Sequence, residues 1–204
     1  LPMLIHRQRA CPSFLEKQLA CSPDFFCEMI HCIYRSDKEE NTEEEVSEDR
    51  QAIATNAWRL LHDWHRPPGL RDDGTFDGDE LNKWLVAVKR TCEESGHLDV
   101  AMINVGNVLF YCPQDPNGLW IHEAAAEVLN VRDGDSLRSG FRTEVFNSRG
   151  AHFVDPTGKD ERELAPQWRD KADAVENRGY SRFAAVLRGL AESYDRQAER
   201  IIDE

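Results

Sequence analysis

The sequence predicts an all-α protein of about nine helices, arranged as antiparallel αα-hairpins in an irregular bundle or a short solenoid-like array. Apolar residues recur at helical spacing along most of the chain, whereas period-two alternation is confined to the short stretch 151–154. Capping residues and glycine or proline stops separate the apolar stripes, so the helices are expected to be joined by short loops.

Two short helices are expected at the N-terminal end. Ser13 and Glu16 have the spacing of a capping box, ahead of a helix that ends near residue 20. The sequence Ser22-Pro23-Asp24 combines an N-cap, a proline at the first helical position and an acid in the first turn, and the stripe Phe26, Met29, Ile30 and Ile33 follows it. We therefore expect residues 1–35 to form an N-terminal helical hairpin.

Residues 36–49 differ in character from their neighbours, because they are nearly all polar and mostly acidic. Such a charge run is typical of a solvated linker, and an acidic tether for a basic partner is the alternative interpretation. The main helical domain is then expected at 50–204.

Three helices are expected between residues 50 and 112. The first stops at Pro67-Pro68-Gly69, and the second begins after Asp77 as N-cap and ends at Gly96. The third has apolar residues on two faces and is therefore expected to be the most buried. The three main stripes are Ile53, Ala57, Leu60, Leu61 and Trp64; Leu81, Trp84, Leu85, Val88 and Cys92; and Leu98, Ala101, Met102, Val105, Val108, Leu109 and Cys112.

Four more helices are expected after the turn at 113–118. Asp160 and Glu163 are expected to open the third of them, and Pro166 inside it predicts a kink or a later start, because a proline removes a backbone hydrogen bond. The stripes of these helices are Trp120, Ile121, Ala124, Ala125, Val128 and Leu129; Leu137, Phe141 and Val145; Leu164, Trp168, Ala172 and Val175; and Phe183, Leu187, Leu190, Ala191, Tyr194 and Ala198.

Charge and composition exclude several classes of function. The net charge of −13 repels phosphate backbones and anionic lipid, and no basic stripe for nucleic acid is visible. No apolar run approaches the roughly 20 residues of a membrane span, and the first residues do not form a signal peptide.

The six cysteines lie mostly in helical patterns, which favours a reduced, cytoplasmic protein. The start at Leu1, without Met, favours a segment of a longer protein.

Two groups of residues have the types that metal or hydrolytic chemistry uses. His62 and His65 lie at i, i+3, but tetrahedral zinc needs a third ligand from elsewhere. Cys27 and His31 lie on one helix, although no cysteine pair has the spacing of a structural zinc site, and burial as small apolar side chains is the alternative. The stretch 73–78 starts like a calcium loop, yet its twelfth position is Trp84 instead of the required Glu. The sequence predicts no bound cofactor or metal.

The loop 147–160 is the most suggestive surface feature, because helix–helix connections usually run about two to eight residues. It brings basic and aromatic side chains into an acidic chain. We predict that Asn147, Arg149, His152 and Phe153 form an interaction loop, with simple mobility as the alternative.

Four further groups of residues carry a resemblance: 23–26 with 33–35, 57–61 with 67–69, 147–150 with 161–165, and 190–194. Together they resemble the C-terminal helical region of large, uncharacterised bacterial multidomain proteins. The resemblance implies a bacterial parent protein, which can include NTPase modules of the STAND kind used in phage defence, and it supplies no catalytic residues.

The sequence thus predicts a non-catalytic helical interaction or scaffold module that binds the remainder of its parent or a protein partner, and neither nucleic acid nor membrane. A structural cap on a longer helical array is compatible with this. The alternative is a metal-dependent or hydrolytic enzyme domain that uses His62 and His65 or Cys27 and His31.

Overall fold

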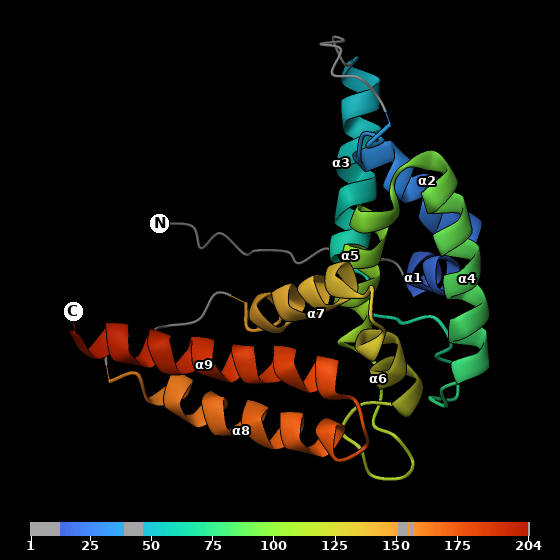
Figure 1. Ribbon diagram of the computed structural model, residues 1–204. Coiled ribbons are helices and arrows are strands. Elements are labelled where there is room, and N and C mark those ends of the chain that lie inside the picture. Colours follow the sequence, from blue (N-terminus) through green and yellow to red (C-terminus); the bar gives the residue numbers. More distant parts are fainter. Residues whose placement is uncertain (1–12, 39–46, 151–154, 156, 204) are drawn as a thin grey trace.

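The computed structural model describes residues 13–38, 47–150, 155 and 157–203, and these residues form an all-α bundle (Figure 1). Helices account for 71% of the described residues, which contain no strand apart from an isolated bridge between Leu70 and Phe76. The predicted fold class is therefore confirmed. The helices in the described ranges are α1 (Ser13–Cys21), α2 (Pro23–Ile33), α3 (Glu48–His62), α4 (Gly78–Ser95), α5 (Leu98–Leu109), α6 (Glu123–Asn130), α7 (Asp135–Asn147), α8 (Lys159–Glu176) and α9 (Ser181–Asp203).

Capping side chains set several helix ends where the sequence predicts them. The Ser22 side chain accepts a hydrogen bond from the backbone N–H of Phe25 at the start of α2, with Pro23 at the first helical position. Asp77 accepts from the N–H groups of Asp79 and Glu80 and so begins α4. Gly96 ends α4 in the left-handed conformation, at a φ of 74° that a side chain disfavours.

The helices form one antiparallel pair, α8 with α9, and one parallel pair, α5 with α7 (Figure 1). The parallel direction follows from the contacts of Asp99 with Ser136 at the starts of α5 and α7 and of Tyr111 with Glu144 near their ends. Helices α8 and α9 follow each other in sequence and lie side by side as an αα-hairpin. Helices α5 and α7 also pack along each other, although α6 separates them in sequence. Helix α2 contacts α1, α3 and α4 at the other end of the molecule. The connectivity is that of an irregular bundle.

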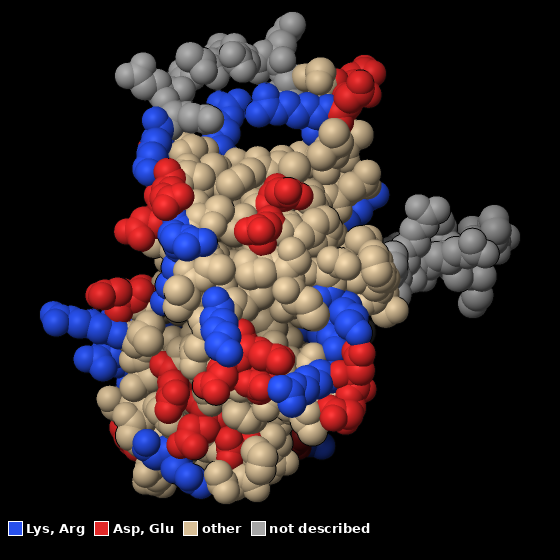
Figure 2. All heavy atoms as spheres, turned by 90° about the vertical axis from the view of Figure 1, so that its right-hand side faces the viewer, with Lys and Arg blue, Asp and Glu red and all other residues tan. Residues whose placement is uncertain are grey.

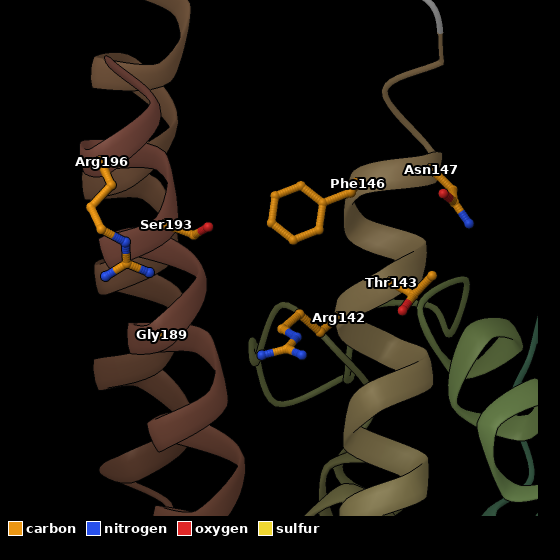
Figure 3. A pocket seen from close by; sticks show the side chains of 7 residues that line it. All are labelled: Arg142, Thr143, Phe146, Asn147, Gly189, Ser193 and Arg196. Carbon is orange, nitrogen blue, oxygen red and sulfur yellow. The ribbon is translucent and has the colours of Figure 1, made fainter. Parts of the chain in front are cut away.

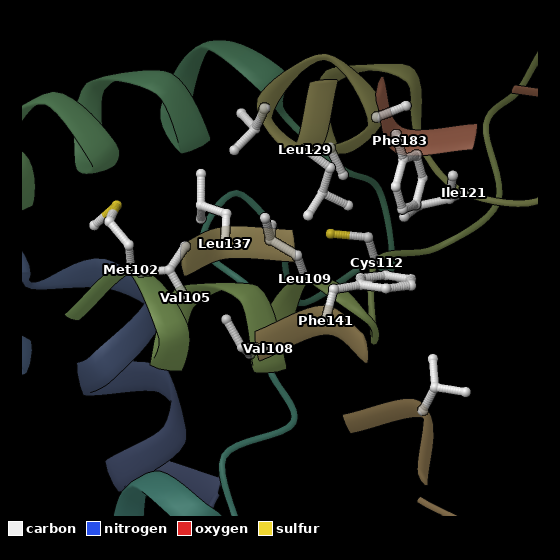
Figure 4. Close-up of a cluster of buried hydrophobic side chains, with 14 of the residues drawn as sticks. Met102, Val105, Val108, Leu109, Cys112, Ile121, Leu129, Leu137, Phe141 and Phe183 are labelled. Atoms are coloured by element: carbon white, nitrogen blue, oxygen red, sulfur yellow. The ribbon is translucent and has the colours of Figure 1, made fainter. Parts of the chain in front are cut away.

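One continuous apolar core runs through the described part of the molecule, from Leu19 in α1 to Tyr194 in α9. Its central part is built from α5, α6, α7 and α9 (Figure 4), where Phe141 and Phe183 meet edge to face with ring centroids 5.1 Å apart. All the residues of the predicted α4 and α9 stripes are buried. The helical spacing of apolar residues therefore identified the inward faces of these helices correctly.

Helices α5 and α7 approach backbone to backbone at two glycines, Gly106 and Gly140. A Cβ atom on Gly106 would overlap the carbonyl oxygen of Leu137 and lie 2.9 Å from the N of Phe141. A Cβ on Gly140 would overlap the carbonyl oxygen of Ile103. The crossing of these helices therefore requires glycine at both positions, and it fixes where α7 lies.

The predicted stripe of α3 is correct only in its second half. Ala57 and Leu61 are buried, but Ile53 is 56% exposed, because the first half of α3 extends beyond its neighbour α2 (Figure 1). Trp64 is buried although the helix ends at His62, ahead of the predicted stop at Pro67.

Helix α8 begins within one residue of the predicted start, but its predicted cap is wrong. Helix α8 begins at Lys159, with Gly158 at the N-cap position, φ 62° and no capping side chain, so Asp160 and Glu163 do not form its cap. The Asp155 carboxylate accepts hydrogen bonds from the backbone N–H and the hydroxyl of Thr157 and so stabilises the turn before the helix. Pro166 lies within the continuous helix, so the later start is wrong, and the kink that was its alternative stays a prediction.

Both ends of the predicted 36–49 linker belong to the described fold. The Lys38 ammonium donates to the carbonyl oxygens of Glu93 and Glu94 at the end of α4, at 2.9 and 2.7 Å, and Ser36 donates to that of Ser95. Ser47 caps α3, which includes Glu48 and Asp49. Residues 39–46 lie outside the described residues.

The five described cysteines are free thiols. Among the described residues, no helix combines the length and the apolar composition that crossing a bilayer requires.

Candidate functional site

A groove runs along the seam between α7 and α9. It consists of two adjoining hollows of about 310 and 350 Å³, which share Arg142 and Gly189 and are therefore continuous. The groove follows α7 from Asp135 to Asn147, a distance of about 18 Å at the 1.5 Å rise of an α-helix. Volumes of this order are typical of ligand or peptide sites.

The two walls of the groove differ in character. The α9 side presents the small residues Ala185, Gly189 and Ser193, which recur at every fourth position and so share one face of the helix. On the α7 side, the Phe146 ring and the Arg142 side chain point toward α9 (Figure 3). A Cβ on Gly189 would meet nothing within 4 Å, so the floor is open at this point.

Two guanidinium groups in the groove are available to an incoming anion. Among the described residues, Arg142 has no ion-pair or hydrogen-bond partner and is exposed. Arg196 lies 3.8 Å from Glu192, and both of these side chains are well exposed. An exposed pair of this kind contributes little, so its cation can exchange partners at low cost.

The other arginines near the groove are engaged by the fold. The Arg138 side chain is buried and donates to the carbonyl oxygens of Leu129 and Val131 at 3.0 and 2.7 Å, and to the Asp135 carboxylate at 2.5 Å. It thereby ties α7 to the end of α6. Asp135 remains largely exposed and places a negative charge at the far end of the groove.

Arg149 and Glu161 form a buried ion pair beside the groove. Their side chains are 3.0 Å apart and 18% and 3% exposed, and the Arg149 guanidinium lies over the Tyr194 ring at 5.3 Å. The Tyr194 ring in turn contacts Phe146 of the groove wall at 5.4 Å. Burial raises the pKa of Tyr194, and the Arg149 charge partly opposes this shift.

The structure divides the predicted interaction loop. Asn147 lines the groove, whereas Arg149 is held in the ion pair with Glu161. His152 and Phe153 lie outside the described residues. The role of this loop in binding stays a prediction.

The candidate catalytic groups have separate partners. The His62 ring stacks on Trp58 at 4.9 Å, and the His65 ring contacts Tyr111 at 4.2 Å. Cys27 faces Cys92, while His31 contacts Ser95. Among the described residues, no three His, Cys, Asp or Glu side chains are placed to hold a metal ion. The enzyme alternative therefore stays a prediction without a convergent site in these ranges.

The calcium-like stretch 73–78 is a turn followed by a helix cap. The Asp73 carboxylate accepts from the N–H and the hydroxyl of Thr75, at 2.9 and 2.6 Å. Asp77 caps α4 and also pairs with Arg71. Their carboxylates thus have partners within the loop.

His31 and His97 share one hydroxyl at the end of α4. His31 Nε2 lies 2.9 Å and His97 Nδ1 3.1 Å from Ser95 Oγ, with the two rings 4.6 Å apart. Partial burial and then the nearby His97 lower the pKa of His31, against a smaller opposite effect of Glu28 on its own helix.

This lowered pKa predicts a pH dependence of stability. Because the unfolded chain protonates His31 at a higher pH than the folded chain, the free energy of unfolding should be highest above about pH 6.5 and should fall below it. Urea denaturation at several pH values should give a shallower fall for His31→Gln than for the wild type. The matched variant His62→Gln, on the exposed face of α3, should keep the wild-type slope. Equal slopes for all three proteins would contradict the prediction.

The face of the molecule shown in Figure 2 has a mixed charge pattern, with acidic side chains gathered in its lower half and basic ones interspersed. The net charge of the chain is −13. The two available guanidiniums of the groove thus lie in a chain whose net charge is strongly negative.

No known protein family, curated protein or solved structure matches this chain. The interpretation of the groove therefore rests on its own geometry and charge.

Proposed function

We propose that this chain is a non-catalytic helical interaction module, and that the α7–α9 groove receives an acidic helical segment of a protein partner. The observation that carries the proposal is the pair Arg142 and Arg196, which lie without a firm partner in a groove of a strongly acidic chain. The partner segment is either part of a longer parent protein or a separate protein in the cytoplasm.

The shape of the groove supports a helical occupant. Its length of about 18 Å equals roughly three helical turns. The small residues on α9 allow the backbone of a partner helix to come close, and the half-buried Phe146 offers an apolar contact near the Asn147 end of the groove.

The charges of the groove define the chemistry of the segment. Glu or Asp side chains on one face of a partner helix could accept hydrogen bonds from Arg142 and Arg196, and such charge-assisted bonds are stronger than neutral ones. Asp135 at the other end disfavours a further acid there. The segment is therefore expected to be acidic at one end and neutral or basic at the other.

A fluorescent helical peptide with two Glu residues one turn apart at one end of a face, Lys at the other end and Leu on the adjacent face tests this proposal. Fluorescence anisotropy at low salt should detect binding, and the double variant Arg142→Gln/Arg196→Gln should weaken it at least about tenfold, since two charge-assisted contacts are lost. The control Arg90→Gln/Arg182→Gln removes the same charge from exposed positions on α4 and at the start of α9. No measurable binding, or an equal loss in both double variants, would refute the groove as the site.

A further inference from the structure

Two buried thiols face each other where α2 packs against α4. The sulfurs of Cys27 and Cys92 lie 3.6 Å apart, and the residues are 2% and 0% exposed. They are 65 positions apart in sequence, so the contact depends on the tertiary structure. No other pair of sulfur atoms among the described cysteines makes such a contact.

The surrounding contacts hold the two helices in this position. His97 Nε2 lies 3.2 Å from the carbonyl oxygen of Tyr34, just after α2. Ser36 and Lys38 bond the last carbonyl groups of α4, as described above. The backbones that carry the two thiols are therefore fixed relative to each other, and the sulfurs need to close by about 1.5 Å to reach the S–S bond length of about 2.05 Å.

We propose that Cys27 and Cys92 form an oxidation site, at which hydrogen peroxide converts the two thiols into a disulfide that joins α2 to α4. In the first step one thiol loses its proton and its sulfur attacks a peroxide oxygen, the O–O bond breaks, and the departing hydroxide takes that proton and leaves as water, so that a sulfenic acid remains. In the second step the other thiol displaces the hydroxyl group as a second water and forms the S–S bond. The two thiols lose two electrons and two protons in total, and the peroxide accepts them.

The geometry treats the two sulfurs alike, because either of them can donate the hydrogen bond that joins them. Burial acts to raise the pKa of both thiols. Either sulfur can therefore be oxidised first, and the other one resolves the sulfenic acid. Cys112 serves as a contrast, because it is also buried, burial raises its pKa, and no thiol faces it among the described cysteines.

Peptide mapping of the peroxide-treated full chain tests the proposal. After treatment, denaturation and alkylation of the remaining thiols, the peptides that contain Cys27 and Cys92 should be recovered as one disulfide-linked species about 2 Da lighter than their sum. Dithiothreitol should release them. Recovery of both residues as alkylated thiols, or as sulfinic or sulfonic acids, would overturn the proposal.

A thermal measurement supplies a second readout. The disulfide closes a long loop, so the melting temperature of the treated wild type should rise by about 5–10 °C and fall again on reduction. Cys27→Ala and Cys92→Ala should abolish the rise, and Cys112→Ala should retain it. The mapping uses the wild-type chain, so it stays decisive if an alanine variant fails to fold. A wild type whose mapped disulfide leaves the melting temperature unchanged would contradict the expected connection between α2 and α4.

Discussion

Replacement of Gly106 by Ala is expected to lower the free energy of unfolding by about 3 kcal/mol, since the new methyl group must displace the α7 backbone. The atom that it meets is the carbonyl oxygen of Leu137, which cannot move without the helix. Alanine is favoured over glycine in an exposed helix interior by up to about 1 kcal/mol, so a loss of stability in Gly106→Ala would show that the clash dominates. Gly140→Ala, which meets the carbonyl oxygen of Ile103, should have a similar effect.

The matched control is Gly189→Ala in α9. Its Cβ meets no atom within 4 Å, so only helix propensity acts and the variant should be more stable by about 0.5–1 kcal/mol. Urea denaturation followed by circular dichroism measures all three variants. If Gly106→Ala and Gly189→Ala changed stability in the same direction, the close crossing of α5 and α7 would be refuted.

Replacement of Arg149 by Met is expected to cost about 3–4 kcal/mol, because it leaves the Glu161 carboxylate buried without its partner. Glu161 has no second cation within the described residues, and its Oε2 atom has no hydrogen-bond partner among them. The contact of the guanidinium with the Tyr194 ring is lost as well, and this loss is part of the expected decrease in the free energy of unfolding.

Two variants separate burial from charge in this experiment. Arg169→Met breaks an ion pair with Asp195 in which the side chains are 49% and 37% exposed, and it should cost less than about 1 kcal/mol. Arg149→Met/Glu161→Met replaces both charges by apolar groups and should recover most of the stability lost in the single variant. If Arg149→Met lowered the free energy of unfolding no more than Arg169→Met does, the Arg149–Glu161 pair would not behave as a buried ion pair.

The fold could be predicted where the apolar stripe of a helix and the residues that define its ends agreed. In α4 and α9 the apolar stripes are long and regular, and Asp77 and Gly96 define the ends of α4 through side-chain and backbone chemistry that is local in sequence. Ile53 shows the limit of this reasoning: a stripe marks a face that can be buried, but burial also needs a neighbouring helix, which the first half of α3 lacks.

The candidate site could be predicted only in small part. Asn147 was singled out from its loop, but Arg142 and Arg196 lie on different helices, and their shared groove depends on how α7 packs against α9. The spacing of Ala185, Gly189 and Ser193 was the available signal in the sequence. Glu161 was missed because it continues the apolar stripe of α8 as a charged residue, and only its pairing with Arg149 explains its burial.

The α8–α9 hairpin also bears on the order in which the molecule forms. Its two helices meet across the short turn 177–180, so little chain entropy is lost when they pair. The α2–α4 contact instead closes a loop of 65 residues. The chain entropy lost in closing this loop is compensated only once the two helices pack. The part of the bundle that carries the floor of the groove therefore depends on nearby sequence, while the thiol pair depends on a contact between residues 65 positions apart.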